Sequence, residues 1–574
     1  MRLSACVLAA SISALALGHA AEAQPKPPNI VVIVADDMGY ADIGVHGSKD
    51  IPTPNVDALA ASGIRFTDGY VSGPYCSPTR AGLLTGRYPQ RFGHEFNIGL
   101  NAAHSEAGLP LSEKTMADRL KASGYRTALF GKWHLGSARR FFPTERGFDE
   151  FFGFLAGAHS YMGLGARNNP IYDGNERATS TTYLTDTLAG RAVEFITRNK
   201  ERPFFLYLAF NAVHAPLQAS DKYLTRFTNI TSEPRRTYAA MLSAMDDGIG
   251  KALAALRQQG LEENTLIFFF SDNGGPITLG GTNGSSNEPL RGQKTTTWEG
   301  GIRVPFIISW KGRLPAGRTD SRPIIQLDVL PTALAAAGVD VQADWKLDGV
   351  NLLPFLTGTA TGSPHEALYW RLGGNMSVRK GEWKLVKSYD GGSGDDPDKQ
   401  TLDGAQLFNL TNDMSEKNNL ARERQDKVKE LADTWQAWRA QLVRPAWEPP
   451  NAYRGARRGC IEPEDTQPMR FYAGTWRGTF GAVRVWTWVL RPDSAGTITF
   501  ARDSVSVPTR MTFVSSDSAV VDLMRPIEGA QRGDSAMLRL TVSVCGDDLV
   551  GTGYMRRRDG TGQGFPFNAS KSPQ

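Results

Sequence analysis

The chain has 574 residues, of which 41% are hydrophobic and 21% are charged. This composition is ordinary for a globular protein, and it excludes a chain that is mainly disordered, because there is ample apolar material for a core. The formal net charge is +5, from 64 Lys and Arg against 59 Asp and Glu. Basic and acidic residues are so evenly balanced that the charge does not indicate a nucleic-acid partner, and we expect none.

The first 23 residues are typical of a signal peptide. Arg2 precedes an almost wholly apolar stretch at 3–17, and residues 21–23 (AEA) offer a cleavage site. The apolar stretch is too short for a transmembrane helix. We therefore expect a mature chain that begins at Gln24, is periplasmic or secreted, and has no membrane contact once the signal is removed.

Three cysteines remain after the signal peptide. An oxidising compartment permits disulfides, and Cys460 and Cys545 both lie in the C-terminal part of the chain. The sequence does not show whether the geometry of these two residues allows a bond. Cys76 is left over, either as a buried small hydrophobic residue or as a residue with a chemical role.

Residues 24–340 alternate between expected strands and helices. Buried strands, rich in β-branched and aromatic residues, are expected at 29–35, 125–130, 203–210, 265–270 and 304–310. Helices are expected at 55–62, 113–123, 183–199 and 236–259. Three of these helices are followed by Gly63, Gly124 and Gly260, and glycine tolerates the left-handed conformation that closes a helix. The alternation predicts an α/β sandwich with a mostly parallel central sheet.

Residues 341–445 predict a small α+β subdomain. Short strands at 367–370 and 383–387 flank a Gly/Asp-rich loop at 390–404, and a helix is expected at 425–442. In that helix the apolar residues lie on roughly one face: Val428, Leu431, Trp435, Trp438 and Leu442.

Residues 446–468, rich in Pro, Arg and Glu, read as a linker. From 469 to 574 strands dominate, with strict alternation of apolar and polar residues at 538–544. We expect a β-rich accessory domain there. An Arg-rich soluble surface and a surface for an anionic polymer are both open for it.

Two polar clusters follow buried strands. Asp36 and Asp37 come after the first expected strand, and Asp272 and Asn273 follow the fourth. Sites in open parallel sheets form at the carboxyl ends of strands, and adjacent carboxylates repel each other unless a cation lies between them. Three carboxylates and one amide oxygen are hard ligands, so the two clusters together predict a Ca²⁺ or Mg²⁺ site.

Cys76 is the most informative residue of the chain. Pro78 suits the first turn of a helix, so Cys76 is expected near a helix N-terminus, where free N–H groups favour an anion. Arg80 falls one turn later on the same face. A cysteine beside an arginine at a helix start can be a reactive thiolate.

Further basic residues follow other expected strands. Lys132 and His134 are two residues apart at one strand end, so they can point the same way into a cleft, and His214 follows the next strand. Lys294 lies in a stretch at 274–301 that is rich in Gly, Asn and Ser, which predicts a flexible rim.

The segment at 76–80 (CSPTR) matches the C-x-P-x-R maturation signature of type I sulfatases, and residues 81–88 (AGLLTGRY) also resemble that family. The resemblance extends from residue 29 to about residue 440 and keeps the family's motif order. It implies an alkaline-phosphatase-like sandwich at 24–340 with the α+β subdomain at 341–445. The last hundred residues lie outside it.

The resemblance also implies two cofactors. In this family a formylglycine-generating enzyme oxidises the signature cysteine, so Cys76 is expected to become formylglycine, whose hydrate is the nucleophile. One calcium ion per chain is expected. Its implied ligands are Asp36, Asp37, residue 76, Asp272 and Asn273.

Catalytic roles follow from the same resemblance. Arg80 and Lys132 would hold the modified residue and its charge. Asp272 would be the base on the hydrate, and His134 the base that collapses the sulfated hydrate to release sulfate. Lys294 and His214 would contact the sulfate, and either could protonate the leaving oxygen.

The sequence therefore predicts an exported sulfatase that hydrolyses sulfate monoesters of a carbohydrate or an aryl alcohol. A phosphonate or phosphodiester hydrolase of the same superfamily is the nearest alternative. A calcium-dependent binder of sulfated glycans, with Cys76 unmodified, comes from another class. An enzyme that uses the Cys76 thiolate directly is a further alternative.

Overall fold

The computed structural model describes residues 26–99, 105–164, 169–179, 181–277, 283–388 and 401–447, together with the backbone of eight strands between 474 and 571. The predicted signal peptide at 1–23, nearly all of the predicted linker at 446–468 and most of the loop at 390–404 lie outside the described residues. So does Cys460, and a bond between it and Cys545 is therefore untested.

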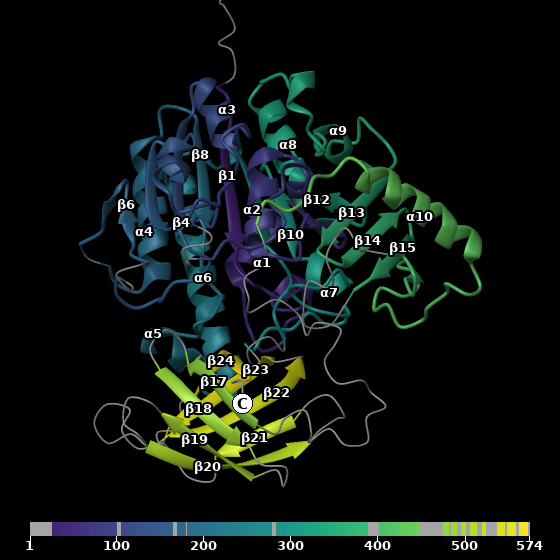
Figure 1. The fold of residues 1–574 in the computed structure, drawn as a ribbon. Helices are drawn as coiled ribbons and strands as arrows, with labels where there is room; N and C mark the ends of the chain where they lie inside the picture. Colours follow the sequence, from purple (N-terminus) through teal and green to yellow (C-terminus); the bar gives the residue numbers. More distant parts are fainter. Residues whose placement is uncertain are drawn as a thin grey trace, which may run out of the picture.

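A ten-stranded sheet forms the centre of the main body (Figure 1). Its strand order is β11-β2-β10-β9-β1-β8-β4-β5-β6-β7. The bounds are β1 Asn29–Ala35, β2 Ile64–Phe66, β4 Arg126–Lys132, β5 Glu150–Phe154, β6 Tyr172–Asp173, β7 Glu176–Arg177, β8 Phe204–Ala209, β9 Thr265–Ser271, β10 Phe306–Ser309 and β11 Arg318–Asp320. The five central strands, from β9 to β5, run parallel, whereas β10 is antiparallel to both of its neighbours. The predicted mostly parallel sheet is confirmed.

Helices cover both faces of this sheet (Figure 1). Successive side chains of a strand point to opposite faces, and those of β1 enter two separate apolar cores. One core contains residues of α1 (Pro54–Ala61), α4 (Leu184–Arg198) and α6 (Glu233–Gln258). The other contains residues of α2 (Cys76–Thr85), α3 (Met116–Ala122) and α8 (Val329–Ala336). A buried strand between two helical layers is what a sandwich requires.

The start of α3 and one of the three helix-closing glycines differ from the prediction. Helix α3 begins at Met116, after the predicted start at 113, because Thr115 and Asp118 form a capping box: Thr115 Oγ1 accepts from Asp118 N at 3.0 Å, and the Asp118 carboxylate accepts from Thr115 N at 2.8 Å. Gly124 and Gly260 have the left-handed φ of +88° and +69°, but Gly63 does not. Gly63 is instead required by close packing, since a Cβ there would lie 2.4 Å from the Ile308 carbonyl oxygen.

A second, antiparallel sheet follows the ten-stranded one along the chain. It contains β13 (Ala367–Leu372), β14 (Asn375–Lys380), β15 (Trp383–Lys387) and β16 (Gln406–Asn409), in that order. Helix α10 (Gln425–Arg439) contributes Leu431, Trp435 and Trp438 to the core of this subdomain, as the apolar face of the sequence predicts. The expected α+β subdomain is confirmed, whereas its boundaries at 341 and 445 stay predictions.

The described residues of the C-terminal part of the chain all lie in strands. Its strands are β17 Gly474–Phe480, β18 Arg484–Leu490, β19 Ala495–Phe500, β20 Val505–Phe513, β21 Ala519–Leu523, β22 Ala536–Cys545, β23 Asp548–Arg557 and β24 Gly562–Lys571. Each strand is antiparallel to the next, and β17 also pairs with β24, so the sheet closes on itself. The predicted alternation at 538–544 falls within β22.

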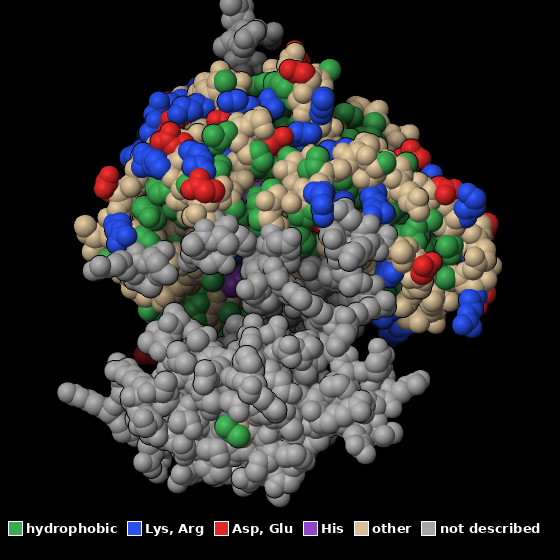
Figure 2. Space-filling view, in the orientation of Figure 1, with side chains coloured by type: hydrophobic (Ala, Val, Ile, Leu, Met, Phe, Trp, Pro, Cys, Tyr) green, Lys and Arg blue, Asp and Glu red, His purple; other side chains and the backbone are tan. Residues whose placement is uncertain are grey.

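Basic and acidic side chains are interspersed over the described part of the face in Figure 2, which agrees with the even charge balance of the sequence. Within the described residues, no helix combines the length and the apolar character needed to cross a bilayer.

Candidate active site

The two acidic clusters meet because their strands are neighbours. Strands β1 and β9 are parallel and in register, with Ala35 opposite Ser271, so the residues that follow each strand lie side by side. Asp37 N donates to Asp272 Oδ1 at 3.2 Å, and Asn273 Nδ2 donates to Asp37 Oδ1 at 2.7 Å. All four polar residues of the clusters are buried. The carboxyl ends of two strands thus build one polar centre.

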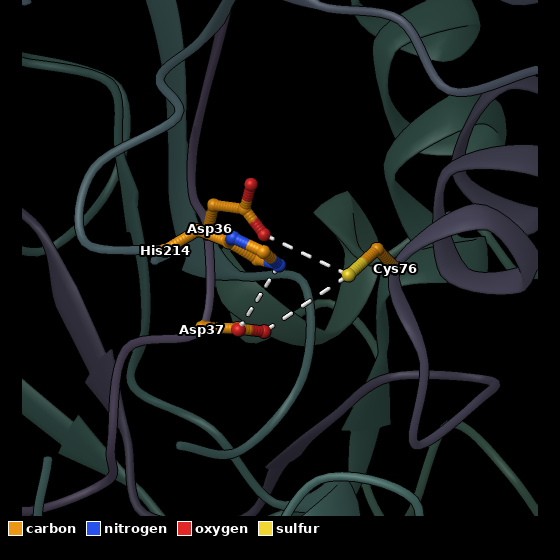
Figure 3. Close-up of side chains that lie close together, drawn as sticks. All are labelled: Asp36, Asp37, Cys76 and His214. Atoms are coloured by element: carbon orange, nitrogen blue, oxygen red, sulfur yellow. Dashed lines mark hydrogen bonds and ion pairs between the residues drawn. The ribbon is translucent and has the colours of Figure 1, made fainter. Parts of the chain in front are cut away.

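Helix α2 brings Cys76 to this centre. The helix begins at Cys76, in agreement with the expected position of this residue near a helix N-terminus. Cys76 Sγ lies 3.7 Å from Asp36 Oδ1 and 3.9 Å from Asp37 Oδ1 (Figure 3). One turn later, Arg80 donates to Asp272 Oδ2 from Nε at 3.0 Å and from Nη2 at 2.7 Å. The thiol therefore contacts Asp36 and Asp37, whereas Arg80 holds Asp272.

Two lysines complete the positive side of the centre. Lys132, the last residue of β4, places Nζ 2.7 Å from Asp36 Oδ2. Lys294 places Nζ 2.7 and 2.9 Å from the two oxygens of Asp37 and 3.2 Å from Cys76 Sγ. With Arg80, the three cations match the three carboxylates in number.

The stretch that the sequence predicts as a rim does not expose Lys294 to solvent. Lys294 is only 4% exposed. Asn287 Nδ2 donates to the Gly275 carbonyl at 2.8 Å, and Thr295 N donates to the Pro74 carbonyl at 2.8 Å. The first bond closes the stretch on itself, and the second joins the residue after Lys294 to the segment just before α2.

The two predicted histidines differ in their contacts. His134 Nε2 lies 3.1 Å from the Ile98 carbonyl oxygen, and its Nδ1 is buried without a partner in the described chain. His214 Nδ1 lies 2.6 Å from the Ala215 carbonyl oxygen, and its Nε2 is 3.5 Å from Asp37 Oδ2. A carbonyl only accepts, so the proton is on Nε2 of His134 and on Nδ1 of His214.

Burial dominates the protonation of this site. It raises the pKa of the Cys76 thiol to about 12, against the opposing effect of Lys132 and Lys294. Burial and the nearby Asp272 raise the pKa of Asp36 to about 7. Burial alone would raise the pKa of Asp37 too, but the Lys294 ammonium holds that pKa below its usual value. Burial and the neighbouring cations lower the pKa of His134 well below 6.5 and that of His214 to about 4, so both imidazoles are mainly neutral at pH 7.

The carboxylate and amide oxygens of this centre fit a hard divalent cation. One ligand atom from each of Asp36, Asp37, Cys76 and His214 lies within 4.8 Å of the others (Figure 3). Asn273 Oδ1 is buried and accepts no hydrogen bond from any described residue. A buried amide oxygen without a donor beside clustered carboxylates is the arrangement that a cation satisfies.

Two tyrosines that the sequence analysis did not single out support these groups. Tyr207 OH in β8 lies 3.4 Å from Arg80 Nη1, and Tyr161 OH donates to the His214 carbonyl at 2.8 Å. Both are fully buried. The signal for Tyr207 is a hydroxyl within an otherwise apolar strand, because a buried hydroxyl requires a partner. The signal for Tyr161 is weaker, since it lies between irregular segments.

Comparisons with known proteins agree with this geometry. The sequence model of the Sulfatase family matches residues 28–339. N-acetylgalactosamine-6-sulfatase of Canis lupus familiaris is 38% identical over 391 residues, which cover 64% of this chain and 73% of that protein. Steryl-sulfatase of Mus musculus is 34% identical over 426 residues, covering 60% of this chain and 67% of that protein.

A solved structure is similar over most of the described chain. The crystal structure of Ps i-CgsB in complex with k-i-k-neocarrahexaose has a TM-score of 0.68 and 37% sequence identity, and the match covers 74% of this chain and 96% of that chain. The family match spans more than half of the 574 residues and includes every residue of the polar centre. The chain therefore belongs to the sulfatase family and is a sulfuric ester hydrolase.

Proposed function

We propose that this sulfatase is exported and removes sulfate from a sulfated carbohydrate, using formylglycine made from Cys76 and one calcium ion. The observation that carries the proposal is the position of Cys76. Cys76 is the first residue of helix α2. Its side chain faces Asp36, Asp37 and the Lys294 ammonium in a buried centre. The relatives named above act on sulfated sugars or sterols by name, and the complex of Ps i-CgsB with k-i-k-neocarrahexaose supports a glycan substrate.

Asp36, Asp37, Asp272 and Asn273 are the residues that would hold calcium, with residue 76 beside them. Calcium, when bound, supplies positive charge that orients the nucleophile and the sulfate. Arg80, Lys132 and Lys294 balance the charge of the three carboxylates. The positive charge of a bound calcium ion is therefore not cancelled by these carboxylates. A sulfate ester is an anion, and a site with this surplus favours it.

The hydrate of formylglycine at position 76 supplies the attacking oxygen. Asp272, held by Arg80, is the proposed base on that oxygen. His134 is the proposed base in the release of sulfate, and the atom that takes the proton is Nδ1, because Nε2–H is committed to the Ile98 carbonyl.

Protonation of the leaving oxygen is left to Lys294 and His214. Lys294 is an ammonium with protons to give. His214 donates from Nε2 only as an imidazolium, because Nδ1–H is committed to the Ala215 carbonyl. The low pKa of His214, about 4, makes this form scarce at neutral pH in the absence of substrate.

The alternatives differ in what they require of Cys76. A direct thiolate enzyme is disfavoured, because burial between carboxylates raises the pKa of the thiol to about 12 and keeps it protonated. A binder of sulfated glycans would keep the thiol and show no turnover. A phosphonate or phosphodiester hydrolase would share the formylglycine and differ only in the preferred ester.

One experiment on protein made with an active maturation enzyme separates these functions. The mass of the peptide that spans residue 76 shows whether sulfur has been exchanged for oxygen. Initial rates are then compared for the sulfate and the phenylphosphonate of one nitrophenol, and for sulfated oligosaccharides. We expect formylglycine and a preference for sulfate. An unmodified thiol, or a preference for phosphonate, would contradict the proposal.

Export is tested by the N-terminus of the mature protein. We propose cleavage after Ala23, so the protein recovered from the periplasm or the medium should begin at Gln24. Retention of residues 1–23 on the active protein would contradict this part of the proposal.

A further inference from the structure

We propose that the segment at 89–98 positions both residue 76 and His134, through His94 and Asn97. This inference rests on the function proposed above and adds positioning residues to it. None of the motifs in the sequence analysis includes the segment. Its contacts with Ser77, the residue after Cys76, are the starting point.

Ser77 is held from two sides. Its backbone N–H donates to Asn97 Oδ1 at 2.9 Å, and its Oγ lies 2.6 Å from His94 Nε2. Helix α2 has no side-chain cap from Tyr75, the residue before it, so one of its free N–H groups is satisfied by Asn97 from another part of the chain. Ser77 and His94 are fully buried, and Asn97 is 8% exposed.

The hydroxyl of Ser77 links the two proposed catalytic residues. Ser77 Oγ donates to the His134 carbonyl at 2.6 Å. A hydroxyl has one proton, so Ser77 Oγ accepts from His94, whose Nε2 carries the hydrogen. Burial lowers the pKa of His94 to about 3, which keeps this ring neutral, and the bond to Ser77 selects its Nε2–H tautomer. The chain His94–Ser77–His134 thus fixes the start of α2 against the backbone of His134.

The same segment sets the tautomer of His134. Ile98 follows Asn97, and its carbonyl accepts the His134 Nε2–H at 3.1 Å, which leaves the Nδ1 lone pair as the base. His134 has a φ of +58°, a conformation that non-glycine residues rarely adopt unless their surroundings hold them. The bonds at its carbonyl and its ring supply that support.

The segment is anchored outside the catalytic body. Glu95 forms a buried ion pair with Arg371 of β13 at 2.6 Å, and its Oε1 accepts from Gly373 N at 2.8 Å. Gln90 Nε2 donates to the Arg371 carbonyl at 2.8 Å. The α+β subdomain therefore supports the active site through 89–98.

The test compares variants that remove these bonds with a matched control. His94→Leu and Asn97→Ala remove the bonds to Ser77, and His94→Gln keeps a donor at a similar reach. Asn29→Ala is the control, because Asn29 is also buried and its Oδ1 also accepts a backbone N–H, from Phe204 at 3.2 Å, at the opposite end of β1. Rates on nitrophenyl sulfate are expressed per mole of formylglycine, measured by mass.

We expect His94→Leu and Asn97→Ala to lower kcat by about 10- to 100-fold, with KM changed by less than about threefold, because misplacement slows the step without removing a contact to substrate. His94→Gln should recover most of kcat. Asn29→Ala should lower Tm and leave kcat near that of the wild type. Wild-type kcat in Asn97→Ala and His94→Leu, or an equal loss in Asn29→Ala, would overturn the inference.

A second readout is independent of turnover. The ¹⁵N shifts of selectively labelled histidines report which ring nitrogen carries the proton. We expect the Nε2–H tautomer at His134 in the wild type, and a mixture in Asn97→Ala. An Nδ1–H tautomer in the wild type would overturn the inference even if the protein proved inactive. Inactivity of the wild type with the expected tautomer would instead count against the proposed function alone.

Discussion

Lys294 Nζ lies 3.2 Å from Cys76 Sγ, although 218 residues separate the two in the chain. The same ammonium lies 2.7 Å from Asp37 Oδ1, so one lysine joins the start of α2 to the end of β1. The site is thus completed only when three distant segments have folded together. Replacing one of its residues should affect chemistry and stability separately, and the two effects can be measured apart.

Cys76→Ala tests the nucleophile. We expect turnover of nitrophenyl sulfate to be lost, because alanine offers no group that can be oxidised to formylglycine. The fold should remain, because alanine removes only one small side-chain atom. The contacts of the Cys76 thiol are with Lys294, Asp36 and Asp37, which also pair with each other or with other residues. Circular dichroism and Tm serve as the controls, and wild-type rates in this variant would refute the mechanism.

Asn273→Leu tests the metal site. Asn273 Oδ1 is a buried oxygen without a donor among the described residues, so leucine removes a ligand while it keeps the size of the side chain. Calcium at 100 times its Kd should stabilise the wild type by about 2.7 kcal/mol, and the gain should be smaller in the variant. The measurement is Tm with calcium against Tm with a chelator. An equal calcium-induced rise in both proteins would exclude Asn273 as a ligand.

Lys294→Met separates charge balance from catalysis. In the metal-free protein Asp37 loses its closest cation, and breaking a buried pair costs about 3–5 kcal/mol. We expect a lower Tm in the presence of a chelator and a larger rise on adding calcium than in the wild type. Because Lys294 is also a proposed sulfate contact, kcat should fall by about 10²- to 10³-fold even with calcium. Unchanged stability in the chelator would contradict the role in charge balance.

The meeting of the two acidic clusters could be expected from the sequence, because each cluster directly follows a buried strand and such ends share one edge of a parallel sheet. Buried β-branched and aromatic runs mark β1 and β9, and each run ends in carboxylates. Once Ala35 pairs with Ser271, Asp36 and Asp272 must come together. The roles of Cys76 and its basic neighbours, by contrast, were predicted from family resemblance and stay predictions.

The environment of Lys294 could not be predicted from its local sequence. Gly, Asn and Ser around it are typical of an exposed loop, yet Lys294 is buried, and the next residue, Thr295, donates to the carbonyl of Pro74, which lies in another part of the fold. His94 and Asn97 left no signal either, because single polar residues without periodicity acquire meaning only through tertiary contacts. Local composition indicates only the preference of a segment for an exposed loop. Contacts with distant parts of the chain decide whether a residue in that segment is buried.

His365 gives a pH-dependent contribution to stability. Its Nε2 lies 2.8 Å from Asp328 Oδ1. Burial opposes the charged form, but Asp328 raises the pKa of His365 above 6.5. The stabilisation is therefore fully present below the unfolded value of about 6.5 and is lost as the pH rises through the folded pKa.

We expect the difference in unfolding free energy between the wild type and His365→Gln to be larger at pH 5.5 than at pH 8.5. His46→Gln is the matched control. Burial lowers the pKa of His46 to about 3, so its difference from the wild type should change in the opposite direction over the same range. Urea midpoints measured at both pH values decide between these signs, and a pH-independent difference at His365 would rule out the ion pair.

Lys384 joins the α+β subdomain to the segment that carries Lys294. Its Nζ lies 2.8 Å from Glu299 Oε1 in helix α7 (Glu299–Ile302) and 2.9 Å from Glu416 Oε1, and all three side chains are fully buried. Lys384→Met leaves two buried carboxylates without this cation, so unfolding should become easier by about 3–5 kcal/mol.

Lys429→Met is the control for this last prediction, because the Lys429–Asp433 pair is exposed on α10 and should contribute only about 0.3–0.5 kcal/mol. Since Glu299 lies five residues after Lys294, the loss at Lys384 should also loosen the active-site segment. Hydrogen exchange at 291–303 should therefore accelerate in Lys384→Met and stay unchanged in Lys429→Met. Equal exchange in the two variants would show that the subdomain does not support this side of the site.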